Sequence, residues 1–200
     1  MNLYAPDTSV VGPVDFRAPM VEVAWNYCQL VIGSSFQRGM IEQTLAALAI
    51  EITLKSYNAV AVGNIGKLNE TYQFQLPQGF KLPPKDRHNL VALAGLLRAD
   101  LRHYLIEPLD EDVLEANKDA FSDSRYSYEP DAPKSFSNSA MKLAIKLICK
   151  TVYLYKQRGC TDPFVSTFDV NAVFFTHVQR YGFAHSQVGW ATCCPPDSSV

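Results

Sequence analysis

The chain has 200 residues, of which 48% are hydrophobic and 19% charged, so it can form one domain with a sizeable core and is too hydrophobic for wholesale disorder. Its formal net charge of −2 excludes a uniformly basic coat for nucleic acid, although not a local basic face. The sequence has no apolar stretch near the roughly 18 residues of a membrane span and no secretory signal pattern at its start, so we expect a cytoplasmic protein that does not enter a membrane.

The first 18 residues are predicted to form an extended N-terminal arm, because Pro6, Gly12 and Pro13 interrupt a mostly polar stretch. A helical domain is expected over residues 19–185, followed by a tail over residues 186–200. The first helix of this domain is predicted from Pro19 to about residue 36, where apolar residues recur at intervals of three and four.

The strongest predicted helix covers residues 40–62, which are rich in Ala and Leu. Its apolar spacing predicts a buried side formed by Ile41, Leu45, Leu48 and Ile52. Gly and Pro then recur through residues 62–84, which indicates a long loop excursion with a short strand-like piece at YQFQL. A loop of this length inside a domain usually carries function or moves.

A single helix is predicted over residues 87–107, capped by Asp86 and ended by Pro108. A shorter helix is expected to begin at Asp110, because acidic residues in a first helical turn are stabilised by the helix dipole.

A long helix is predicted over residues 140–159, after a turn-rich stretch at 122–139, and Gly159 is expected to close it. Residues 169–182 are compatible with either a last helix or a strand.

The motifs of several enzyme and metal-site classes are missing from the sequence, which has no phosphate-binding Gly-rich loop, no HExxH and no paired CxxC. We therefore expect neither a metal nor a cofactor. An odd count of five cysteines argues against a disulfide framework. Cys28 and Cys149 lie in apolar helical patterns and are interpreted as core residues.

A basic stripe recurs every four residues at Lys142, Lys146 and Lys150, and no acidic residue occurs between residues 134 and 158. Such a stripe could contact phosphate groups. The alternatives are a solvated helix face, or an ion-pair contact with the acidic segment 107–131.

An arginine followed by a histidine after four residues occurs twice, at Arg98–His103 and at Arg180–His185. Such a pair can cleave RNA, because histidine transfers protons and arginine offsets phosphate charge. On a straight helix the two side chains point about 140° apart, so Arg98 and His103 would not share a face without a partner subunit. Purely structural roles remain the alternative for both pairs.

Taken in order, three short motifs resemble those of the HEPN superfamily. They are Glu51 and Lys55 one turn apart in a strong helix, His88 opening the next helix as H-N-L-x-x-L, and Arg125-Tyr126 in a turn before a long helix. The resemblance covers about residues 20–158. It implies an all-α, antiparallel up-and-down helical bundle, usually a homodimer. Many members of this family are metal-independent RNases in toxin–antitoxin or phage-defence systems, and others bind nucleotides or RNA.

The resemblance also implies a ligand site, in which Glu51, Lys55, His88, Arg125 and Tyr126 would gather at one end of the bundle around an anionic ligand. The alternative is a buried polar network that fixes helix ends.

Catalytic members of the family carry Arg followed by His after four to six residues, and no His follows Arg125 within residues 127–133. The preferred expectation is therefore a non-catalytic nucleotide- or RNA-phosphate-binding module in a bacterial stress or defence system. The alternatives are a metal-independent endoribonuclease that uses one of the Arg-x4-His pairs, and a structural protein-protein interaction domain.

Overall fold

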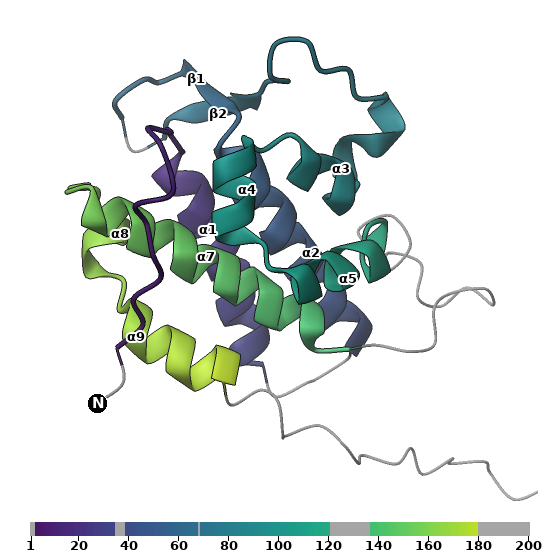
Figure 1. Ribbon diagram of the computed structural model, residues 1–200, viewed down its shortest axis with the longest axis vertical. Coiled ribbons are helices and arrows are strands. Elements are labelled where there is room, and N and C mark those ends of the chain that lie inside the picture. Colours follow the sequence, from purple (N-terminus) through teal and green to yellow (C-terminus); the bar gives the residue numbers. More distant parts are fainter. Residues whose placement is uncertain (1–2, 35–38, 68, 121–136, 180–200) are drawn as a thin grey trace, which may run out of the picture.

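The computed structural model describes residues 3–34, 39–67, 69–120 and 137–179, and within them the chain is mostly helical (Figure 1). One small two-stranded sheet accompanies the helices in this part of the chain. The elements in chain order are α1 (Ala18–Ile32), α2 (Gly39–Ser56), β1 (Ala59–Gly63), β2 (Thr71–Phe74), η1 (Pro84–His88), α3 (Leu90–Gly95), α4 (Ala99–Leu105), α5 (Pro108–Ala116), α7 (Ser139–Gln157), α8 (Pro163–Thr167), α9 (Val170–Val173) and η3 (Phe174–Gln179).

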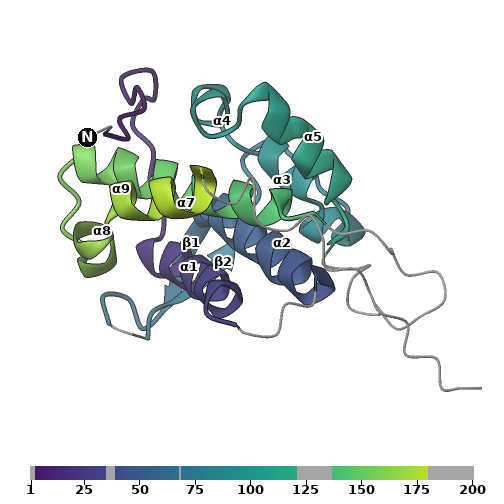
Figure 2. The same ribbon diagram turned by 90° about the horizontal axis from the view of Figure 1, so that it is seen from below.

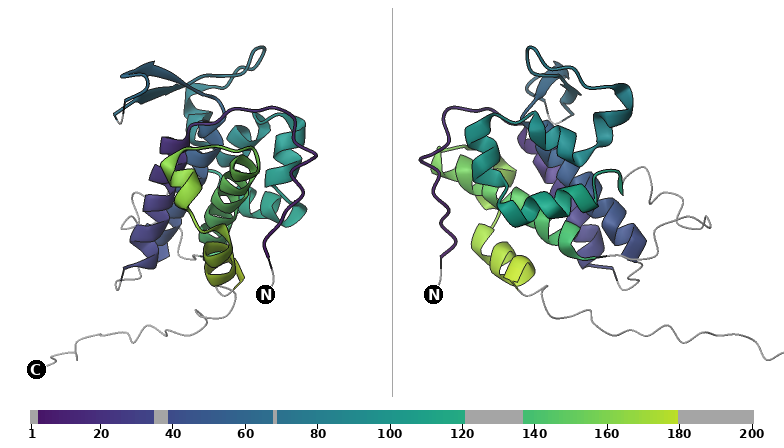
Figure 3. Two further views of the ribbon diagram at one scale, coloured as in Figure 1. Left: turned by 90° about the vertical axis from the view of Figure 1, so that its left-hand side faces the viewer. Right: turned by 45° about the vertical axis from the view of Figure 1, so that its right-hand side comes forward.

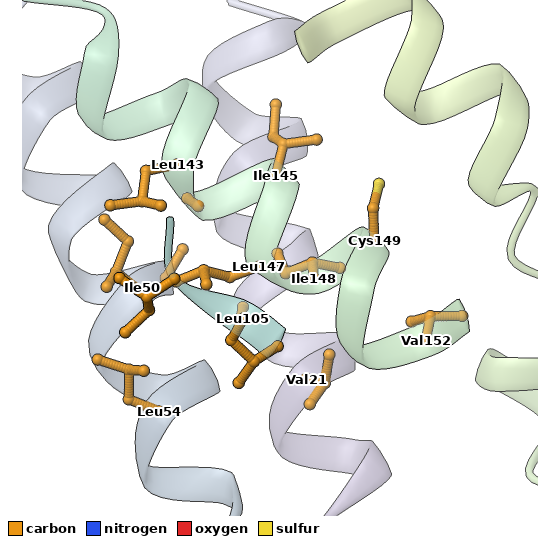
Figure 4. Packing of buried hydrophobic residues seen from close by; sticks show 14 of the residues in the cluster. Val21, Ile50, Leu54, Leu105, Leu143, Ile145, Leu147, Ile148, Cys149 and Val152 are labelled. Atoms are coloured by element: carbon orange, nitrogen blue, oxygen red, sulfur yellow. The ribbon is translucent and has the colours of Figure 1, made fainter. Parts of the chain in front are cut away.

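Helix α7 runs through the middle of the core, as the close view in Figure 4 shows. Leu147 and Ile148 are fully buried on this helix, and Ile50 of α2 and Leu105 of α4 are buried in the same cluster. Burying one such side chain contributes roughly 1.5–3 kcal/mol. The prediction for this helix is confirmed, including its end, where Gly159 has a φ of 73° that favours glycine.

Helix α2 lies beside α1 and against α7 (Figure 2), but its buried side is not the predicted one. The fully buried positions include Ala46, Ala47 and Ile50, whereas Ile41 is 55% exposed. The other three predicted core residues, Leu45, Leu48 and Ile52, are only partly buried. Because α2 is apolar on most of its circumference, spacing alone could not select the face, and the small alanines allow neighbouring helices to approach closely.

The single helix predicted over residues 87–107 is wrong, because the chain forms η1, α3 and α4 there. Asn89 rather than Asp86 caps α3, since its side chain accepts a hydrogen bond from the Ala92 N–H. The next helix, α5, begins at Pro108, two residues before the predicted start. Proline fits a first helical turn, where its missing N–H leaves no intrahelical bond unmade.

The loop excursion contains a β-hairpin that stands at one end of the helical body (Figures 1 and 3). The strand-like piece predicted at YQFQL is confirmed as β2, whose Phe74 pairs with Ala59 of β1. The predicted extension of the preceding helix to residue 62 is wrong, since α2 ends at Ser56 and the valine-rich residues after it form β1. Valine favours a pleated surface when a partner strand is present.

Residues 3–16 run extended along the outside of the helical body towards α1 (Figure 3), and Val11 and Phe16 are buried. Beyond residue 169, where helix and strand were both open, the structure forms α9 and η3. Cys28 and Cys149 are buried, as predicted. Among the described residues, no helix is long and apolar enough to span a membrane.

Candidate functional site

Three of the five residues predicted to form a ligand site meet at the C-terminal end of α2. Lys55 Nζ lies 2.6 Å from Glu51 Oε1, one helical turn away. His88, the last residue of η1, places its Nδ1 2.9 Å from the same oxygen. Segments that are 37 residues apart therefore share one carboxylate oxygen. We call Glu51, Lys55 and His88 the α2-end cluster.

Within the α2-end cluster, exposure of the side chains to solvent increases from Glu51 through Lys55 to His88. The side chain of Glu51 is 5% exposed, that of Lys55 is 15% exposed and that of His88 is 46% exposed. The Lys55 ammonium also lies 5.4 Å from the centre of the Phe74 ring, so β2 covers one side of the cluster. His88 is therefore the member of the cluster that is most exposed to solvent.

One atom of the cluster has no hydrogen-bond partner in the part of the chain that the structure describes. Glu51 Oε2 is buried, whereas Oε1 receives both the lysine and the histidine. A buried carboxylate oxygen without a donor is costly, by roughly 1–3 kcal/mol. A buried polar atom in this position needs a partner, such as an ordered water or a ligand atom.

The remaining two predicted ligand-binding residues, Arg125 and Tyr126, lie outside the described residues. The same holds for Arg180 and His185, the second of the two candidate RNase pairs.

Two of the three lysines predicted as a phosphate surface are instead held in an internal ion-pair network. Lys146 Nζ lies 2.8 Å from Asp110 Oδ2 and also 2.8 Å from Glu107 Oε2. Lys150 Nζ lies 2.8 Å from Glu107 Oε1 and donates to the carbonyl oxygen of Tyr104 at the end of α4. These two lysines therefore form the ion-pair contact with the acidic segment that the sequence offered as an alternative. They do not offer an open basic face.

Lys142, the third residue of the stripe, is partly exposed. It lies on the same helix face one turn before Lys146, and no carboxylate of the described residues forms an ion pair with it. A single partly exposed lysine does not make the continuous basic track that a nucleic-acid backbone needs.

The contacts with Lys146 and Lys150 lower the pKa of Glu107. Partial burial opposes ionisation of this carboxyl, but hydrogen bonds from Lys146 and Lys150 outweigh that effect and lower its pKa to about 2. The stabilisation from its ionised form is therefore complete above its ordinary pKa near 4.5 and is lost as the pH falls towards 2. We expect Glu107→Gln to flatten the fall in urea midpoint between pH 5 and pH 3. An equally steep fall in wild type and variant would contradict this assignment.

The first candidate RNase pair is not arranged for catalysis. The guanidinium of Arg98 binds Asp100, with Nη2 2.7 Å from Oδ2, and donates from Nη1 to the carbonyl oxygen of Pro13 at 2.6 Å. The bond from Arg98, together with the N–H of Gly12, lowers the pKa of Asp100 well below its ordinary range. His103 is exposed on α4, but the arginine is already engaged with a carboxylate and cannot readily offset phosphate charge.

Within the acidic segment 107–131, which the sequence offered as the partner of the lysines, the residues that hold them are Glu107 and Asp110. Sequence reasoning missed two other residues that organise these regions, since Asp100 holds Arg98 and Phe74 covers Lys55. In the part of the chain that is described, no three His, Cys, Asp or Glu residues are grouped so as to hold a metal ion.

Comparisons with known proteins do not assign a family to this chain. No protein-family model, no curated protein and no solved structure matches it significantly. Its function is therefore inferred from the α2-end cluster and from the charges around it.

Proposed function

We propose that this chain is a non-catalytic binding module for a nucleotide or for RNA phosphate, built as a HEPN-like antiparallel up-and-down bundle and acting as a homodimer in a bacterial stress or defence system. The observation that carries the proposal is the convergence of Glu51, Lys55 and His88 at one pole of α2. A purely structural network would have closed this pole, whereas His88 keeps nearly half of its side chain in solvent.

The charge distribution supports an anionic ligand at this pole. Residues 62–88 carry four basic side chains and two acidic ones, a net charge of +2. Since the whole chain has a net charge of −2, the remaining residues carry −4. The excursion that contains His88 is therefore more basic than the rest of the chain, which favours an anionic ligand there.

In the proposed complex a phosphate group meets the imidazole of His88 at the rim, and the ammonium of Lys55, which also pairs with Glu51, lies behind it. Hydrogen bonds from charged donors to phosphate are short and strong. Glu51 orients both donors through its single shared oxygen, so it is a positioning residue for the ligand.

The proposal predicts that nucleotides stabilise the folded protein. At a ligand concentration of 100 times Kd the gain is about 2.7 kcal/mol, which thermal denaturation detects easily. The test compares ATP, GTP, a short single-stranded RNA and inorganic phosphate on the full chain. We expect His88→Ala to raise the apparent Kd of the ligand at least tenfold. His103→Ala, at an exposed histidine on α4, is expected to leave the apparent Kd unchanged.

Two results would overturn the proposal. One is that none of the four ligands raises the melting temperature, which would favour the interaction-domain alternative. The other is that a ligand binds equally well to the wild type and to His88→Ala.

The geometry favours binding over RNA cleavage. Arg98 is held by Asp100 and by the backbone of Pro13, so the pair with His103 lacks an available cation. Incubation of labelled RNA with the protein in EDTA tests this directly. Cleavage that is lost in His103→Ala or His185→Ala would establish the endoribonuclease instead.

A further inference from the structure

The N-terminal arm, residues 3–16, is bound to the body of the protein chiefly through its backbone. Arg158 Nη2 donates to the carbonyl oxygens of Val11 at 2.7 Å and Gly12 at 2.9 Å. The next carbonyl, that of Pro13, accepts from Arg98. Because these bonds involve no arm side chain, they hold an extended chain in register without depending on its sequence.

Two more hydrogen bonds hold this part of the arm. The Tyr155 hydroxyl donates to the carbonyl oxygen of Val14 at 2.8 Å, and the N–H of Gly12 donates to Asp100 Oδ2 at 2.8 Å. A Cβ atom on Gly12 would lie only 3.1 Å from Arg98 Nη2. The close approach of the guanidinium therefore favours glycine at this one position of the bound segment.

Two aromatic rings anchor the ends of the arm. The Phe16 ring stacks on Tyr155 with its centre 3.7 Å away. The Tyr4 ring lies 3.9 Å from Phe174 of η3, and its backbone N–H donates to Asn171 Oδ1 at 2.8 Å. Backbone bonds in the middle and a ring at each end are the usual features of a recognised peptide.

The arm has almost no structure of its own. Within residues 3–16, all of which are described, the backbone makes one hydrogen bond to itself, from the N–H of Val11 to the carbonyl oxygen of Thr8. Its conformation therefore comes from the surface beneath it. That surface is built from separate parts of the fold, since Arg98 precedes α4, Tyr155 lies in α7 and Asn171 lies in α9.

We propose that residues 3–16 are a ligand bound in cis, and that the surface beneath them is a peptide-binding site that also accepts this segment from a second copy of the chain. We call this surface, formed by Arg98, Asp100, Tyr155, Arg158, Asn171 and Phe174, the arm site. The same atoms recognise the segment whichever copy supplies it, so exchange of arms between two copies requires no new contact. The arm of the same copy competes for the arm site with the arm of a second copy, and it does so at a high effective concentration because it is covalently attached. Exchange is therefore weak unless contacts of the attached arm are lost.

The test uses the full chain and a fluorescent peptide that carries residues 3–17. In Tyr4→Ala the attached arm loses one ring anchor, and we expect this variant to bind the peptide at least tenfold more tightly than the wild type. Adding Arg158→Ala to this variant is expected to weaken peptide binding at least tenfold. Adding Lys118→Ala instead, which removes an exposed cation paired with Glu115, is the matched control and leaves binding unchanged.

The peptide itself provides a second comparison. A peptide with Gly12→Val is expected to bind at least tenfold more weakly, because the new side chain meets the guanidinium of Arg98. Anisotropy measures binding, and circular dichroism checks that each variant melts cooperatively.

The proposal is overturned if folded Tyr4→Ala does not bind the peptide, or if binding is insensitive to Arg158→Ala. If Tyr4→Ala does not fold, the wild type is titrated with excess peptide and compared with Arg158→Ala alone. Saturable binding that requires Arg158 then supports the arm site, and its absence overturns it. None of these outcomes depends on whether the α2-end cluster binds phosphate.

Discussion

Replacing Lys150 by alanine is expected to lower the free energy of unfolding by about 2 to 3 kcal/mol, because the change removes a buried ammonium whose hydrogen bonds are charge-assisted. The Lys150 side chain is 7% exposed, and its ammonium contacts Glu107 and the carbonyl oxygens of Tyr104 and Leu105. Alanine leaves those two carbonyls at the end of α4 without their charged donor. Urea denaturation at pH 7 measures the loss.

The matched control for this variant is Lys142→Ala, two turns earlier on α7 at a partly exposed position. We expect it to change the free energy of unfolding by less than about 0.5 kcal/mol, as is usual for surface substitutions. Lys150→Met is expected to lose less than Lys150→Ala, because it fills the volume of the lysine stem. A loss below 1 kcal/mol for Lys150→Ala would show that the network around Glu107 contributes little to stability.

Replacing Leu147 by alanine is expected to cost about 3 to 4 kcal/mol, since a large buried side chain is removed from a packed core. Leu147 is fully buried on α7, in the cluster that also contains Ile50 and Leu105 (Figure 4). The cost combines the lost transfer of apolar atoms from water with the cavity left between these helices. Thermal and urea denaturation should both report it.

Leu109→Ala serves as the control with the same chemical change. Leu109, the second residue of α5, is 79% exposed, so its loss should alter the free energy of unfolding by no more than about 0.5 kcal/mol. Similar costs for the two substitutions would mean that α7 is not the centre of the core.

The parts of the fold that were predictable from sequence are those that local signals determine. Gly159 ends α7 through its left-handed backbone, and this is visible in the sequence as a glycine after the last apolar turn. The break between α3 and α4 was missed because the apolar spacing continues through Gly95 and Leu96 as if one helix ran on. The hairpin was predicted only in part, because β1 exists through its pairing with β2, which is not a local property.

The α2-end cluster was predictable in the same limited sense. A Glu and a Lys one turn apart predict an ion pair on a helix. The approach of His88 to Glu51, in contrast, depends on where η1 packs. The lysine stripe shows the opposite case. Its spacing at Lys146 and Lys150 was identified correctly, and the acidic segment 107–131 that supplies Glu107 and Asp110 was one of the partners considered. A charge pattern therefore locates a face, but it does not decide between solvent, a ligand and another helix as what covers it.

The contact between Tyr4 and Asn171 spans 167 residues, which has a consequence for the chain as it is being made. The ribosome produces the N-terminal segment first, but the surface that receives it is complete only after α9 has been synthesised. At about 5–20 residues per second, the two are separated by roughly 8 to 33 seconds. During that interval the Tyr4 ring has no native place to bury, so the N-terminal segment of the nascent chain has to wait in a non-native state for its binding surface.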